Sequence, residues 1–173
     1  YLLRYPYGCL EQTTSSTIPW VAAKKLHPIA PKFRARSMAS IEKNIQAGAD
    51  RLLSMQTADG GLSYWPGSLR PTPWASSYGG LGILLCQEAG AQVPSSSLDR
   101  LAVYLSNQLR NLSKAKTSYD LDVHARALYV LARLGKAEPA YQAKLLEQID
   151  KLSGTARAFL ALAVHESGQQ GAL

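Results

Sequence analysis

The sequence predicts an all-α protein whose helix hairpins form a barrel or part of one. Apolar residues recur at helical spacing along most of the 173 residues, and no stretch alternates as a β-strand would. Three of the expected helices share a nearly all-apolar pattern and end at Gly90, Gly135 and Gly168. The helices between them are more polar and amphipathic. One set is therefore expected to be enclosed and the other to face water in part.

Each element follows from spacing and from helix-ending residues. The first helix is expected to run to Leu26, and Pro19 inside it predicts a kink or a late start. The second is expected to begin near Ile41 and to close at the turn formed by residues 59–61, which precedes a loop rich in prolines and aromatics. In chain order, the expected helices cover residues 12–26, 41–59, 74–89, 97–112, 121–134, 140–152 and 155–167.

Composition excludes several classes of function. The net charge is +7, but the basic residues are scattered rather than gathered in a stripe, so we expect no nucleic-acid partner. No apolar run is long enough to span a bilayer. Histidines and cysteines are too sparse for a metal site, so neither a metal nor another cofactor is expected. The chain opens without a methionine or a signal peptide, and we interpret it as a fragment of a longer protein.

The most informative stretch is residues 5–16, YPYGCLEQTTSS. Pro6 and Gly8 predict a turn just before a helix. Cys9 and Gln12 are three residues apart at that helix start, so a thiol and a carboxamide are expected to touch. A helix N-terminus also stabilises a thiolate. Residue types alone leave a reactive and a structural Cys9 as equal alternatives, because no histidine lies in a recognisable protease context.

Gly8-Cys9-Leu10-Glu11-Gln12 resembles the thioester motif of the alpha-2-macroglobulin and complement family, and Leu10 is typical of its bacterial members. Pro19 also falls where that family has a proline, and residues 59–65 and 72–78 resemble two further family stretches. The resemblance implies an α/α toroid of about twelve helices, of which this chain supplies about seven as a partial ring. It further implies that residues 1–173 are a thioester domain, a fragment of a larger multidomain protein.

The same resemblance implies a function. Cys9 would be joined to the side-chain carbonyl of Gln12, and Glu11 would support the motif. Tyr5 and Tyr7 are candidates for shielding the bond, and His124 is a candidate for the histidine that transfers the acyl group in some complement members. The protein would be a broad-spectrum protease inhibitor rather than an enzyme, and it would capture target proteases through their amines after cleavage of a bait region. Neighbouring domains of the same chain would be further partners.

The expected location is the periplasm or the cell surface, with a lipid anchor outside this segment as the only route to a membrane. Two other classes stay open on the sequence. An α/α-barrel hydrolase or cyclase would need paired carboxylates, for which Asp59, Asp120 and Asp122 are the candidates. A helical-repeat scaffold that binds a protein partner would leave Cys9 inert.

Overall fold

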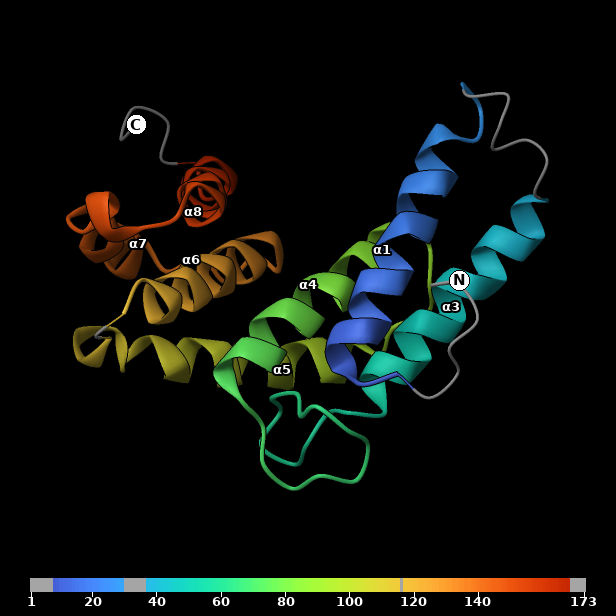
Figure 1. The fold of residues 1–173 in the computed structure, drawn as a ribbon, viewed down its shortest axis with the longest axis horizontal. Coiled ribbons are helices and arrows are strands. Elements are labelled where there is room, and N and C mark those ends of the chain that lie inside the picture. Colours follow the sequence, from blue (N-terminus) through green and yellow to red (C-terminus); the bar gives the residue numbers. More distant parts are fainter. Residues whose placement is uncertain (1–7, 30–36, 116, 169–173) are drawn as a thin grey trace.

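The computed structural model describes residues 8–29, 37–115 and 117–168, and it confirms the all-α class (Figure 1). Over these residues the chain forms seven α-helices and two short 3-10 helices, and its only β feature is an isolated bridge between Gln56 and Leu62. The α-helices are α1 (Leu10–Leu26), α3 (Met38–Leu53), α4 (Pro73–Glu88), α5 (Ser95–Leu109), α6 (Ser118–Arg133), α7 (Pro139–Leu146) and α8 (Gly154–Glu166). The 3-10 helices are η2 (Leu112–Lys114) and η3 (Ile149–Lys151).

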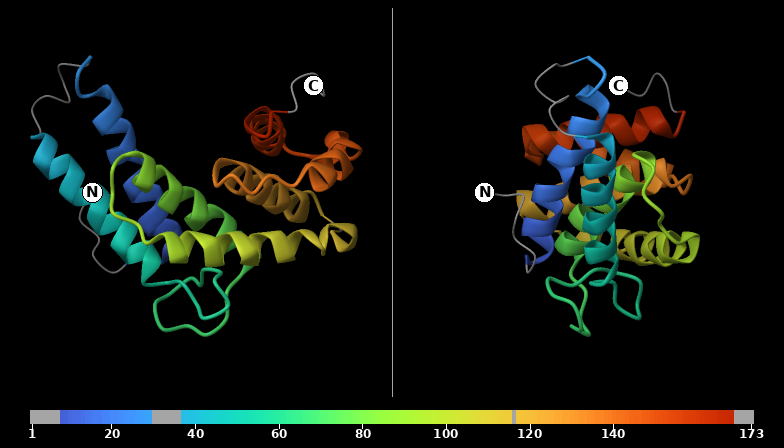
Figure 2. Two further views of the ribbon diagram at one scale, coloured as in Figure 1. Left: turned by 180° about the vertical axis from the view of Figure 1, so that it is seen from behind. Right: turned by 90° about the vertical axis from the view of Figure 1, so that its right-hand side faces the viewer.

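The helices form two layers, as in a segment of an α/α toroid. In the inner layer α1 packs on α4, α4 on α6, and α6 on α8. Each outer helix bridges two inner ones: α3 contacts α1 and α4, α5 contacts α4 and α6, and α7 contacts α6 and α8. Figures 1 and 2 show α1 and α3 at one end of the molecule and α7 and α8 at the other. The three nearly apolar helices expected from the sequence are α4, α6 and α8. The prediction that this set is enclosed is confirmed for α4 and α6, which bury ten residues each, but it is wrong for α8, which buries four of its 13 residues and leaves Leu162 exposed.

Several element ends differ from expectation. Helix α1 begins at Leu10, with Cys9 as its N-cap, and it continues through Pro19, so a late start is wrong. Helix α3 ends at Leu53, short of the turn at residues 59–61. Helix α7 ends at Leu146 rather than near residue 152, because it buries only Gln142 and Leu145 and therefore gains little from packing. The helix ends at Gly90 and Gly135 are confirmed, and both glycines have positive φ, +95° and +70°.

Glycines bring α1 close to its neighbours. A Cβ added to Gly48 of α3 would lie 2.3 Å from Thr17 Oγ1. One added to Gly79 of α4 would lie 2.8 Å from Leu10 Cδ1. Neither separation is compatible with a side chain, so close packing of α1 depends on these glycines. In the described ranges, no helix combines the length and the hydropathy that crossing a membrane requires.

Candidate functional site

The first turn of α1 brings Cys9 and Gln12 together. Cys9 has an extended backbone (φ −63°, ψ 172°), as an N-cap residue should. Its backbone N–H donates to Gln12 Oε1 at 3.2 Å, while its side chain faces the backbone N–H of Gln12. This reciprocal arrangement is a capping box, with Cys and Gln where Ser/Thr and Glu/Gln are usual. The thiol and the carboxamide therefore lie on the same side of one helical turn.

Three hydrogen bonds hold this turn in place. The Gly8 carbonyl accepts hydrogen bonds from Arg51 Nη2 and from Thr13 Oγ1, each at 3.3 Å. The Leu10 N–H donates to the Tyr64 carbonyl at 2.9 Å, which ties the turn to the loop before α4. Gly8 is buried and Cys9 is half-buried. The turn is thus fixed by α3, by α1 itself and by the aromatic loop.

Glu11 and Gln12 are exposed, and Glu11 is connected through Ser15 to a row of aromatic rings formed by Tyr78, Trp74 and Tyr64. Ser15 Oγ donates to Glu11 Oε1 at 3.0 Å and lies 2.9 Å from Tyr78 Oη on α4. Tyr78 packs against Trp74 with ring centroids 5.2 Å apart, and Trp74 stacks on Tyr64 at 5.7 Å. Glu11 is therefore hydrogen-bonded within α1, and the aromatic row contacts α1 at both of its ends, through Tyr78 Oη and through the Tyr64 carbonyl.

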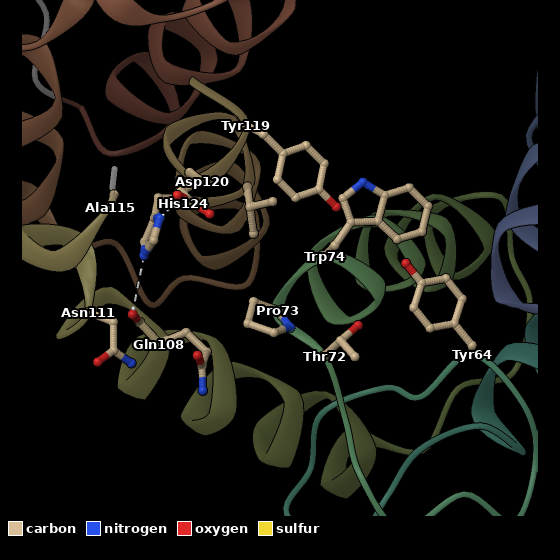
Figure 3. A pocket seen from close by; sticks show the side chains of 11 residues that line it. Tyr64, Thr72, Pro73, Trp74, Gln108, Asn111, Ala115, Tyr119, Asp120 and His124 are labelled. Carbon is tan, nitrogen blue, oxygen red and sulfur yellow. Dashed lines mark hydrogen bonds between the residues drawn. The ribbon is translucent and has the colours of Figure 1, made fainter. Parts of the chain in front are cut away.

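An open pocket of about 470 Å³ lies beyond this row, between the starts of α4 and α6 and the end of α5. Figure 3 shows Tyr64 and His124 on opposite sides of it. His124 is 8% exposed; its Nδ1 lies 2.7 Å from the Asp120 carbonyl and its Nε2 lies 3.3 Å from the Gln108 carbonyl. Both ring nitrogens therefore face backbone oxygens of α5 and α6.

The remaining candidate residues take structural positions or lie outside the described ranges. Tyr5 and Tyr7 are outside them. Asp120 caps α6 by accepting from Thr117, and Asp122 accepts from the N–H of Ser153, so these two carboxylates hold helix ends. Asp59 is exposed in a loop. Over the described residues, no three His, Cys, Asp or Glu side chains gather as metal ligands would.

Cys9 and Cys86, both free thiols, have opposite environments. Cys86 is fully buried, and burial raises the pKa of its thiol to about 12. A thiol held in its neutral form is a poor nucleophile, so Cys9, half-buried at the helix start, is the candidate nucleophile of the two. Sequence reasoning missed Arg51, which gives no local signal because its contact with Gly8 spans 43 residues of chain.

Comparisons with known proteins agree with this architecture, although no family model matches the chain. The alpha-2-macroglobulin of Escherichia coli K12 is 29% identical over 143 residues, which are 79% of this chain and 9% of that protein. The alpha-2-macroglobulin of Thermotoga maritima is 32% identical over 123 residues, which are 71% of this chain and 7% of that protein. The chain thus spans less than a tenth of the length of these curated relatives.

Solved structures give the same result. Native E. coli alpha-2-macroglobulin superposes with a TM-score of 0.79 at 26% identity, covering 98% of this chain and 11% of that one. A crystal structure of the E. coli protein from domain MG7 to its C-terminus gives 0.78 and covers 98% of this chain and 28% of that one. Salmonella alpha-2-macroglobulin reacted with methylamine gives 0.79, covering 98% of this chain and 12% of that one.

The layered helices place the chain among the α/α toroids. Within that class it belongs with the bacterial alpha-2-macroglobulins, and it matches their C-terminal region.

Proposed function

We propose that this chain is the thioester domain of a bacterial alpha-2-macroglobulin-like protease inhibitor, and that Cys9 and Gln12 form its thioester. The observation that carries the proposal is the capping box. It places the Cys9 side chain against the first turn of α1 and folds the Gln12 carboxamide back to within 3.2 Å of the Cys9 nitrogen. Two groups that react with each other are thereby held in one turn, where orientation replaces a bimolecular encounter.

The chemistry needs only these two side chains. Cys9 Sγ adds to Gln12 Cδ, the C–Nε2 bond breaks, and the nitrogen leaves with the thiol proton as ammonia. The product is a thioester, an acyl donor without the resonance of an amide. A primary amine R–NH₂ then attacks the same carbon; the C–S bond breaks, a secondary amide forms on Gln12, and the proton lost by nitrogen ends on Sγ. Each thioester is consumed once, so the protein acts as an inhibitor and not as an enzyme.

Related structures support amines and proteases as the targets. E. coli alpha-2-macroglobulin has been activated by trypsin and by porcine elastase, and the Salmonella protein has been reacted with methylamine. For this chain we propose that a protease first cleaves a bait region elsewhere and that its amines then take the acyl group. The mechanism uses no histidine, because both nitrogens of His124 face backbone carbonyls across the pocket from Tyr64.

The site is exposed in this chain, and a thioester there would need a cover in the resting protein. Gln12 is exposed and Cys9 is half-exposed, and water would hydrolyse an open thioester. We propose a neighbouring domain as the cover, with Tyr5 and Tyr7 as local shielding. Such an inhibitor would work where foreign proteases arrive, in the periplasm or at the cell surface.

Covalent capture of a protease tests this function. The full-length natural protein is mixed with trypsin, and products are separated by denaturing electrophoresis. We expect an adduct that survives denaturation, that is absent for Cys9→Ala and that is prevented by prior treatment with methylamine. The matched control is Cys86→Ala, which removes the buried thiol and is expected to keep the adduct. An adduct of equal yield with Cys9→Ala would contradict the proposal.

A further inference from the structure

The peptide unit between Gly8 and Cys9 is held at both of its polar ends. Its carbonyl oxygen accepts from Arg51 Nη2 and from Thr13 Oγ1, each at 3.3 Å. Its N–H donates to Gln12 Oε1 at 3.2 Å. One amide plane therefore connects a guanidinium of α3 to the oxygen of the Gln12 carboxamide on α1.

Arg51 contacts the Gly8 carbonyl from a position that is energetically unfavourable for a guanidinium. It lies in the last turn of α3, half-buried, and its Nε is buried with no hydrogen-bond partner in the described part of the chain. The ion pairs found among the described residues do not include it. A half-buried guanidinium with an unsatisfied nitrogen is unfavourable unless another contact compensates. The Gly8 carbonyl is the contact that the structure provides.

A cation at a carbonyl oxygen changes the rest of the amide. It draws electron density toward oxygen and makes the N–H of the same peptide a stronger donor, as in other polarised hydrogen-bond chains. It also fixes the plane of the peptide, and hence the direction in which the Cys9 N–H points. Thr13 adds a neutral donor to the same oxygen from one turn along α1.

The acceptor of that N–H is the oxygen on which charge would develop. If Cys9 and Gln12 form the thioester proposed above, on which this inference rests, Gln12 Oε1 remains as the acyl oxygen while Nε2 is replaced by Sγ. When an amine adds to Cδ, the π electrons of the C=O bond move onto Oε1. They return when the C–S bond breaks, and Sγ then takes the proton released by nitrogen.

We propose that the Cys9 backbone N–H is the oxyanion donor of this acyl centre, and that Arg51, with Thr13, is the positioning residue that holds and polarises it. The same N–H serves both directions of the chemistry, since ring closure by Sγ passes through an oxyanion on the same atom. Removing a direct oxyanion donor slows acyl transfer by about 100-fold or more. Removing a residue that acts through that donor is expected to slow it by about 10-fold.

The test compares methylamine reaction rates in the full-length natural protein. Arg51→Met is expected to release the Cys9 thiol about 10-fold more slowly than wild type, and Arg51→Lys to recover part of the rate. The matched control is Arg133→Met, which removes a half-buried arginine at the end of α6 that donates to Tyr129 of the same helix and to Glu88 of α4. It is expected to lower stability and leave the rate unchanged.

A second readout separates polarisation from mere folding. With Gln12 labelled at Cδ by ¹³C, the infrared C=O stretch of the thioester is expected to move to higher frequency in Arg51→Met, because the hydrogen bond to its oxygen is weaker. Thr13→Val is expected to shift the band in the same direction by less. The matched control Thr17→Val removes a buried hydroxyl that binds the Thr13 carbonyl, and no shift is expected.

The outcomes distinguish this inference from the function on which it rests. A wild-type protein that loses no ammonia and takes up no methylamine refutes the thioester itself. A wild type that reacts, with Arg51→Met and Thr13→Val reacting at the wild-type rate and showing the wild-type band, refutes the role of Arg51. If Arg51→Met forms no thioester, Thr13→Val decides: an unchanged rate and band overturn the inference, and a slower rate with a shifted band supports it.

Discussion

Two helices of the inner layer, α6 and α1, bury different kinds of residue. Helix α6 buries ten residues, nearly all apolar, and its main partner is α8. Helix α1 buries Thr13, Thr14 and Thr17, and each hydroxyl binds a backbone carbonyl of its own chain segment. Helix α6 is therefore part of an apolar scaffold, while α1 holds a polar turn in a fixed geometry.

The scaffold around α6 and the polar turn of α1 should therefore respond differently to substitution. Loss of apolar volume near α6 and α8 should lower the free energy of unfolding without changing the chemistry of folded molecules. Small changes beside α1 should alter the geometry of the turn at Cys9 as well as stability.

Leu128→Ala should give the largest loss of stability. Leu128 is fully buried on α6, and removing a buried leucine side chain costs about 2–5 kcal/mol. Denaturant unfolding of the variant measures this loss. The rate of methylamine reaction, measured where the variant is still folded, should equal that of wild type. A large change in that rate would show that the scaffold and the turn are coupled.

Gly48→Ala should lower the free energy of unfolding less than Leu128→Ala does, but it should also change the geometry of the turn at Cys9. The added Cβ would lie 2.3 Å from Thr17 Oγ1, so α1 and α3 must separate. Overpacking of this kind costs about 1–3 kcal/mol, offset in part by the better helix propensity of alanine. Because Arg51 is one turn further along α3, the methylamine rate should fall too.

The matched control for Gly48→Ala is Gly154→Ala at the start of α8, where an added Cβ meets nothing within 4 Å. It should unfold at the same denaturant concentration as wild type or at a slightly higher one. The double variant Gly48→Ala with Thr17→Ala should recover part of the rate, because it relieves the clash. A Gly48→Ala protein with an unchanged rate would show that helix spacing does not set the turn.

The Cys86 thiol should make the free energy of unfolding depend on pH only in alkaline solution. Burial raises the pKa of its thiol from 9.0 to about 12, so the unfolded chain releases this proton at lower pH than the folded chain. The unfolded state therefore gains as pH rises, and the contribution of Cys86 to stability is lost between pH 9 and 12. Unfolding midpoints measured across this range should fall less steeply for Cys86→Ala. An equal slope for both proteins would contradict the assignment.

Much of the fold could be predicted because it depends on local pattern. Helical spacing gave the seven helices, and Gly90 and Gly135 marked two of their ends, since positive φ is a local requirement. Helix α1 begins earlier than the sequence predicts, because cysteine is not a usual N-cap residue and its capping box is not expected from the sequence. Helix α7 is shorter than the sequence predicts, because pattern alone does not show how few of its residues find a packing partner.

The site divides in the same way. Proximity of Cys9 and Gln12 follows from a spacing of three residues, which sequence displays. Arg51 of α3 binds Gly8 just before α1, and Tyr78 of α4 contacts Ser15 in the second turn of α1. These contacts span 43 and 63 residues of chain, and such tertiary contacts leave no periodic signal. Local rules therefore locate the candidate pair Cys9 and Gln12, and packing supplies the groups that hold it.

The most direct measurement is the intact mass of the native full-length protein, before and after methylamine, with peptide mapping of the segment that contains Cys9 and Gln12. The account predicts a native mass lower by one ammonia than the sequence requires, a blocked Cys9 thiol, and a gain of one methylamine on Gln12 with release of that thiol. A native protein of full sequence mass, with a Cys9 thiol that titrates freely and a Gln12 that methylamine leaves unchanged, would contradict it.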